Sequence, residues 1–140
     1  MGDRAAPRSV TLDDLSAEGA RLWRELGPGS VVWLSGELGA GKTTFVQAVA
    51  ESAHAIRARS PTFALVHQYE SPEGTIAHVD CYRLRHPDDA RDLDLLELAH
   101  RSRLTLIEWP ERAGTHAPQP DRHVHLGHAA DPSTRTLAIS

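Results

Sequence analysis

A phosphate-binding loop is the feature of this chain that most restricts its fold. Residues 36–43 read Gly-Glu-Leu-Gly-Ala-Gly-Lys-Thr, which matches the pattern G-x-x-x-x-G-K-[ST]. The chain has 15 lysines and arginines, and Lys42 of this loop is its only lysine. A compact ammonium fits a narrow phosphate cradle better than the planar fork of arginine does. A random chain of this composition would contain the motif roughly once in a thousand cases, so we interpret the loop as functional.

The residues on either side of the loop predict the strand and the helix that such a loop connects. The apolar run at 31–35 is typical of a buried strand, and Phe45, Val46 and Val49 recur at helical spacing. In this arrangement backbone N–H groups and the helix N-terminus point at phosphates. We expect Lys42 to contact the β- and γ-phosphates of a nucleotide and Thr43 to contact a magnesium ion. The alternative is a glycine-rich turn that opens an ordinary helix.

Length and composition predict a single domain. A flexible arm is expected over residues 1–9 and a single P-loop domain over residues 10–140. The net charge of −4 argues against a dedicated nucleic-acid-binding protein, which normally carries a basic face. We expect no signal peptide and no membrane span. The single cysteine, Cys81, excludes an internal disulfide and favours a cytoplasmic location.

The order of elements predicts an α/β fold. Thr11 and Asp14 resemble a capping box at the start of a helix. Alternating strands and helices after the loop predict a P-loop NTPase-like three-layer sandwich with a mixed, mainly parallel sheet and a C-terminal β-hairpin. Beyond the loop and its helix we expect strands at 62–69, 75–82 and 104–109, a helix at 87–101 with a break inside it, and a hairpin of 121–126 with 134–139.

Two carboxylates are candidates for work beside a bound nucleotide. Glu108 ends an apolar strand, where an acid of this fold class usually holds the magnesium shell, and the alternative is a strand-end charge facing solvent. Asp80 ends a second apolar stretch and shares a strand face with His78 and Tyr82. A carboxylate inside a strand is unfavourable unless it is paired. Asp80 is therefore either a functional group near the phosphates or an edge residue pointing to water.

Other candidates are less specific. The proline-containing stretch Ser60-Pro61-Thr62 is either a nucleotide sensor that closes on the γ-phosphate or a turn that starts a strand. Trp109 either packs on the nucleotide or a partner, or belongs to the core. The spacing His123-x-His125-x-x-His128 suits a metal site only weakly, because no acid or cysteine completes the set. Cys81 is most simply a small core residue.

Four motifs together resemble the TsaE family, small bacterial P-loop ATPases needed for threonylcarbamoyladenosine modification of tRNA at A37. They are the loop at 36–44, Ser-Pro-Thr-Phe at 60–63, His-Val-Asp-Cys-Tyr-Arg-Leu at 78–84 and Ile-Glu-Trp-Pro-Glu at 107–111. The resemblance covers about residues 10–139, with the motifs in the family's order and spacing. It differs at Glu37, where aspartate is usual, at Cys81, where leucine is usual, and at Asp94, where glycine is common.

The resemblance implies the cofactors ATP and Mg²⁺ and a set of site residues. It implies catalytic roles for Lys42, Asp80 and Glu108, and magnesium binding by Thr43 and Glu108. It also implies that residues 60–62 form a switch-like loop and that Trp109 has a functional role beside the site. The residues expected to bind the nucleotide are Glu37, Leu38, Gly39, Ala40, Gly41, Lys42, Thr43, Thr44, Thr62 and Trp109.

The leading hypothesis is an ATPase that is weak alone and depends on partners. The resemblance implies docking on TsaB- and TsaD-type proteins, which ATP hydrolysis would reset between cycles, with tRNA contacted only through that complex and no membrane involved. The alternatives are a small-molecule P-loop kinase and a non-hydrolysing, nucleotide-dependent binding module. The surroundings of Thr11 and Arg135 are expected to form the walls of a base pocket. The absence of an N-K-x-D motif gives no support for guanine selectivity.

Overall fold

The computed structural model describes residues 6–57 and 65–140. Its first helix begins as the sequence predicts, because the hydroxyl of Thr11 accepts the backbone N–H of Asp14 while the Asp14 carboxylate accepts that of Thr11. The elements, with 3-10 helices labelled η, are β1 (Arg8–Thr11), α1 (Leu12–Glu25), β2 (Ser30–Ser35), α2 (Lys42–Ser52), β3 (Ile56–Arg57), β4 (Val66–Ser71), β5 (Gly74–Asp80), η1 (Pro87–Leu93), α3 (Leu95–Arg101), β6 (Leu104–Glu108), η2 (Pro110–Arg112), η3 (Gly114–His116), β7 (Arg122–His128) and β8 (Thr134–Ile139).

The described strands form one mixed sheet in the order β1-β8-β7-β2-β6-β5-β4-β3. The central strands β7, β2, β6 and β5 pair in parallel, and antiparallel pairs flank them on both sides. The carboxyl ends of the central strands therefore meet at one edge, where ligands of open α/β sheets usually bind. The predicted α/β fold and the C-terminal hairpin are confirmed.

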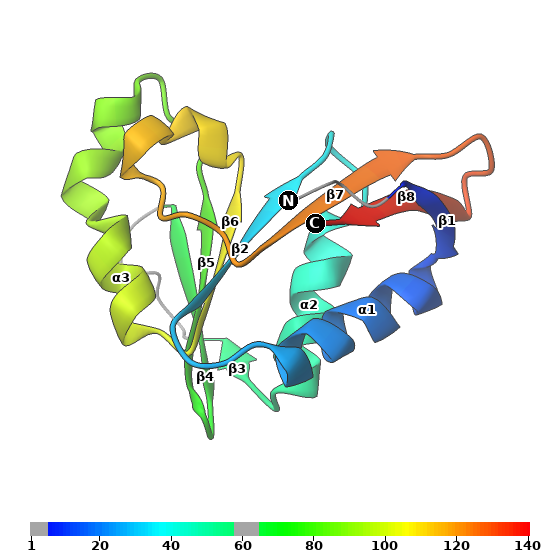
Figure 1. Ribbon diagram of the computed structural model, residues 1–140, viewed down its shortest axis with the longest axis horizontal. Helices are drawn as coiled ribbons and strands as arrows, with labels where there is room; N and C mark the ends of the chain where they lie inside the picture. The colour runs from blue at the N-terminus through cyan, green and yellow to red at the C-terminus, as the bar shows by residue number, and fades with distance from the viewer. Residues whose placement is uncertain (1–5, 58–64) are drawn as a thin grey trace.

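Alternate residues of the strands bury against two different helical layers. Val32, Leu106 and Ile76 pack in one apolar cluster with residues of α1 and α2, whereas Val31, Ile107 and Ala77 pack in a second cluster with residues of α3. Figure 1 shows this arrangement, with α3 on one side of the sheet and α1 and α2 on the other. The fold is therefore a three-layer sandwich, and each face of a central strand has its own core.

In the structure one local prediction is wrong in part, one is confirmed and located, and one strand is additional. The prediction of a loose arm over residues 1–9 is wrong for Arg8 and Ser9, which pair with Leu137 and Thr136 of β8. The break expected within residues 87–101 lies at Asp94, whose left-handed φ of 46° separates η1 from α3. Strand β3 has no counterpart among the predicted elements. None of the helices in the described part of the chain is long and apolar enough to cross a membrane.

The central strand β6 contains a polar group whose removal should stabilise the protein. Thr105 is fully buried, and its hydroxyl finds no hydrogen-bond partner among the described residues. Its register partners are Val31 of β2 and Ala77 of β5, so its surroundings are apolar. Because an unsatisfied buried hydroxyl costs about 1–3 kcal/mol, Thr105→Val should raise the free energy of unfolding by about 1 kcal/mol in urea titrations. A variant less stable than the parent would contradict this account.

Candidate functional site

The polar site is built where two apolar rows end at the carboxyl edge of the sheet. Leu104, Leu106 and Glu108 alternate along the face of β6 that packs on α1 and α2, and Ile76 and Asp80 lie on the same face of β5. Asp80 and Glu108 are register partners across the β5–β6 pair. The ends of β5 and β6 therefore bring the two predicted acids together, on the face of the sheet that α2 covers.

The phosphate-binding loop has a shape that glycine alone fits at two positions. Gly41 caps the N-terminus of α2 with a left-handed φ of 109°, and a Cβ there would lie 2.8 Å from Cδ2 of Leu15. A Cβ on Gly36 would lie 2.5 Å from the backbone oxygen of Leu126. Both glycines allow the loop to lie directly against α1 and β7.

Lys42 is the cation of the site and is almost completely buried. Its ammonium donates a hydrogen bond to the backbone oxygen of Gly36 at 2.6 Å and lies 3.5 Å from Oε1 of Glu108. The same nitrogen lies 4.4 Å from the ring centroid of Trp109. A lysine is buried in this way only when its charge is compensated. The loop thus holds a paired ammonium beside the start of α2.

The environment of Glu108 keeps its carboxyl group ionised. Burial by itself would raise the pKa of Glu108, but the hydrogen bond from His78 and the charge of Lys42 outweigh burial, so the pKa is lowered. A general base that works near neutral pH needs a pKa close to that pH. Glu108 is therefore suited to hold a cation rather than to accept a proton.

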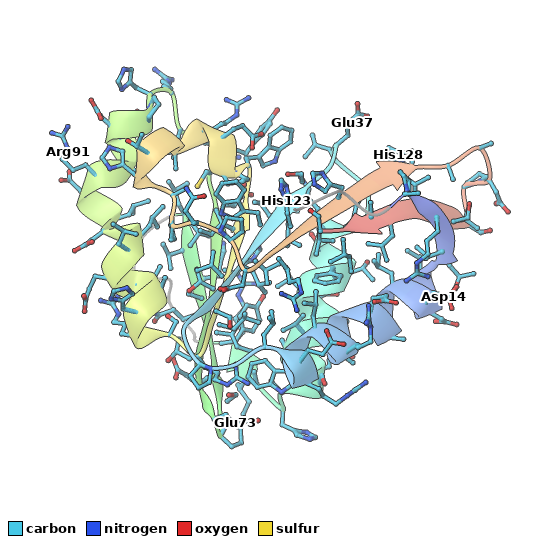
Figure 2. All side chains as sticks on the ribbon, viewed as in Figure 1. Asp14, Glu37, Glu73, Arg91, His123 and His128 are labelled. Atoms are coloured by element: carbon cyan, nitrogen blue, oxygen red, sulfur yellow. The ribbon has the colours of Figure 1, made fainter. Side chains whose placement is uncertain are left out.

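A cavity of about 360 Å³ connects the loop with the acids. The predicted residues Asp80 and Glu108 line it, whereas Glu37, Ala40 and Trp109 are not part of its lining. Figure 2 shows the side chain of Glu37 pointing away from the protein, and Thr62 lies outside the described residues. The lining consists of Leu12, Leu38, Gly39, Gly41, Lys42, Thr43, Thr44, His78, Asp80, Glu108 and Arg135.

The C-terminal hairpin holds the loop from outside. The imidazole Nε2 of His128 donates to the backbone oxygen of Leu38 at 3.0 Å, and Nε of Arg135 donates to that of Gly39 at 3.2 Å. Figure 2 labels His128 on β7, close to the loop that carries Glu37. In a trans peptide the following N–H points away from the carbonyl, so the contact at Leu38 directs the N–H of Gly39 away from the hairpin. The sequence indicated His128 only as part of a weakly supported metal site and did not predict this contact.

Trp109 packs against the core, and its expected contact with a nucleotide or a partner stays a prediction. Its side chain is partly buried against the core cluster under α3, and its ring also contacts the Lys42 ammonium. Its backbone is left-handed, with φ of 55°, directly before Pro110. The ring of Tyr82 lies 5.1 Å from it, and the Arg112 guanidinium is close to both rings. Trp109 therefore links the core to the buried cation of the loop.

The three C-terminal histidines do not assemble a metal site in the structure. The rings of His123 and His125 stack with centroids 3.8 Å apart, and His128 contacts the phosphate-binding loop instead. Across residues 6–57 and 65–140, no group of three or more histidine, cysteine or acidic side chains is arranged to hold a metal ion. Cys81 is buried in the core cluster under α3, and burial raises the pKa of its thiol to about 12. A thiol of this kind is unreactive.

Comparison with known proteins identifies a family. The sequence model of the family described as "Threonylcarbamoyl adenosine biosynthesis protein TsaE" matches residues 10–137. Proteins named tRNA threonylcarbamoyladenosine biosynthesis protein TsaE are similar to this chain. The one from Bacillus subtilis is 36% identical over 105 residues, 74% of this chain and 65% of its own length. The one from Rickettsia bellii is 41% identical over 106 residues, covering 72% and 71%.

A third relative has the same name, and a solved structure shares the fold. The TsaE protein of Haemophilus influenzae is 32% identical over 102 residues, covering 72% of this chain and 65% of that protein. The chain thus spans about two thirds of the length of these relatives. The crystal structure of YdiB from Bacillus subtilis superposes with a TM-score of 0.74 over 100% of this chain and 88% of that one. At 23% identity that superposition shows the shared fold alone.

Proposed function

The chain belongs to the TsaE family of tRNA threonylcarbamoyladenosine biosynthesis proteins, and from this premise we propose that it is a magnesium-dependent ATPase. The observation that carries the proposal is the convergence of Lys42, Thr43, Asp80 and Glu108 on one cavity. An ammonium, a hydroxyl at a helix N-terminus and two carboxylates are the groups that P-loop nucleotide hydrolysis uses. A second cavity, of about 460 Å³, is also lined by Leu38 and Asp80, but its lining does not include Lys42, Thr43 or Glu108.

The residues around the cavity fit a magnesium nucleotide. Gly39, Gly41 and the N-terminus of α2 present the backbone to phosphate oxygens, and Lys42 adds a positive charge. The hydroxyl of Thr43 and the carboxylate of Glu108 are hard oxygen ligands, which Mg²⁺ prefers. When bound, Mg²⁺ neutralises charge that develops on the phosphates during transfer to water. We assign the magnesium shell to Thr43 and Glu108.

Asp80 is the second acid of the proposed reaction. Its Oδ1 accepts the backbone N–H of Tyr82 at 3.0 Å, which fixes the carboxylate at the end of β5. Because Glu108 is assigned to the magnesium shell, Asp80 is the acid left in the cavity to orient the attacking water. We assign the base of ATP to the part of the cavity lined by Leu12 and Arg135.

The proposed cellular role is to serve the enzymes that modify tRNA. The chain docks on TsaB- and TsaD-type proteins in the cytoplasm, and ATP hydrolysis resets that complex between cycles. The net charge of −4 supports contact with tRNA through the complex rather than directly. The kinase alternative needs an acceptor for the phosphoryl group, whereas the ATPase transfers it to water.

A reconstituted reaction tests the proposal. The purified chain, incubated with Mg-ATP and cell metabolites, should release free phosphate slowly, and adding TsaB- and TsaD-type partners should increase both phosphate release and threonylcarbamoyladenosine in tRNA. EDTA should abolish the turnover. A phosphorylated metabolite in place of free phosphate would support the kinase instead. Nucleotide binding without turnover in the full mixture would support the binding module.

A further inference from the structure

We propose that His78 is a positioning residue that holds the carboxylate of Glu108 at the edge of the cavity. The imidazole Nε2 of His78 lies 2.5 Å from Oε2 of Glu108. An ionised carboxylate only accepts hydrogen bonds, so Nε2 carries the proton and donates it. The two side chains are 13% and 9% exposed, so water competes little for this bond. The inference rests on the magnesium role proposed for Glu108.

The register of the sheet places the two side chains together. His78 lies two residues before Asp80 on the same face of β5, and Asp80 is the register partner of Glu108. On the other side, His78 is the register partner of His67 in β4, and the two rings lie 6.0 Å apart. The imidazole therefore sits between two neighbouring strands. The backbone pairing of β5 with β6 sets the position of His78 beside Glu108.

Lys42 is the other partner of Glu108, and its contact with the carboxylate can change. Its ammonium is shared between the carbonyl of Gly36, the carboxylate of Glu108 and the ring of Trp109. It ends a long flexible chain, and phosphate oxygens in the loop would compete for the same charge. His78 keeps its position on β5 whatever the ammonium contacts. Glu108 thus has one partner that can change and one that is fixed.

Fixing a carboxylate has a defined consequence for metal binding. Groups that hydrogen-bond to metal ligands orient them, and losing such a group typically costs about 10- to 100-fold in metal affinity. Without the His78 bond, Glu108 would have to be reoriented at the expense of magnesium binding. Loss of the His78 bond should therefore lower nucleotide affinity in the presence of Mg²⁺. Nucleotide affinity without Mg²⁺, which depends on the phosphate-binding loop, should not change.

Three substitutions separate the hydrogen bond from packing. His78→Leu removes the donor and keeps an apolar body, His78→Gln keeps an N–H near the position of Nε2, and His78→Asn keeps an amide that is too short to reach Glu108. The matched control is His116→Leu, which removes another histidine–carboxylate bond, to Asp88 at 3.1 Å, far from the loop in the η1–η3 region. Thermal unfolding verifies that each variant is folded.

The readout is the gain in affinity that magnesium gives to a non-hydrolysable ATP analogue. Calorimetry in Mg²⁺ and in EDTA yields this gain, and electron paramagnetic resonance of Mn²⁺ with the analogue measures the metal directly. We expect His78→Leu and His78→Asn to lower the gain about ten-fold or more while affinity in EDTA stays unchanged. His78→Gln should retain the gain within about three-fold, and His116→Leu should leave it unaltered.

Several results would overturn the proposal. A wild-type gain in folded His78→Leu or His78→Asn would show that the bond does not position Glu108, while the ATPase proposal would stand. An equal loss in Mg²⁺ and EDTA would assign His78 a purely structural role. If His78→Leu does not fold, the comparison of His78→Gln with His78→Asn gives the same decision. A wild-type chain with no magnesium gain would overturn the positioning role and the ATPase proposal together.

Discussion

Lys42→Ala should reduce ATP hydrolysis by about 10²- to 10³-fold and weaken nucleotide binding to the same degree, in phosphate-release assays and calorimetry. The reason is local: Lys42 is the only lysine of the chain, and its ammonium lies at the start of α2, inside the cavity that the loop and the two acids line. The backbone N–H groups of the loop survive the substitution. Their dipoles alone do not replace a full charge at the phosphates.

Two further variants make this result specific. Lys42→Arg keeps the positive charge but replaces a compact ammonium with a planar guanidinium. Because position 42 is only 5% exposed, the larger group does not fit there, and Lys42→Arg should be little more active than Lys42→Ala. Arg101→Ala removes an exposed cation from the last turn of α3, on the opposite side of the sheet, and should leave turnover unchanged. Full activity of Lys42→Ala would contradict the assignment of the cavity to the phosphates.

The local signals in the sequence account for most of the fold. The capping pair Thr11 and Asp14, the glycine loop and the apolar strands at 31–35 and 104–109 each encode structure within a few residues. The capping pair and the loop are found where expected, and the two strands lie within one residue of the predicted bounds. Strands β1 and β3 are different. Val10 is the only apolar residue of β1, and β3 consists of Ile56 and Arg57, so both depend on pairing with distant strands. A sequence read locally carries no signal for such edges.

The site also combines features that are encoded locally with contacts that depend on distant segments. Lys42 and Thr43 follow from the motif, and Asp80 and Glu108 follow from their position at the ends of apolar strands; all four line the cavity. The contacts made by His128 and Arg135 depend on how the C-terminal hairpin lies across a loop about 90 residues earlier, as Leu38 and His128 show. The sequence placed His78 beside Asp80 on one strand face, but the bond to Glu108 required the register of β5 with β6.

Glu108→Gln is expected to have the second largest effect and to change both turnover and acid stability. Glutamine keeps the shape of Glu108 but supplies no negative charge, so magnesium loses an anionic ligand and hydrolysis should fall about 10²-fold or more. The ammonium of Lys42 also loses its carboxylate partner at 3.5 Å. Because hydrogen bonds to charged groups contribute about 1.5–3 kcal/mol, the variant should be destabilised by about 2 kcal/mol at pH 7.

The sign of the pH dependence follows from the lowered pKa of Glu108. Its folded pKa lies below the ordinary value of 4.5, so the folded state binds the proton less readily than the unfolded chain does. The stabilisation from Glu108 is therefore complete above about pH 4.5 and is lost as the pH falls through the folded pKa. The difference in unfolding free energy between the parent and Glu108→Gln should then be largest near pH 7 and shrink in acid. Denaturation at several pH values measures it, and a difference that stays constant down to pH 3 would mean that Glu108 is not held as a buried anion by His78 and Lys42.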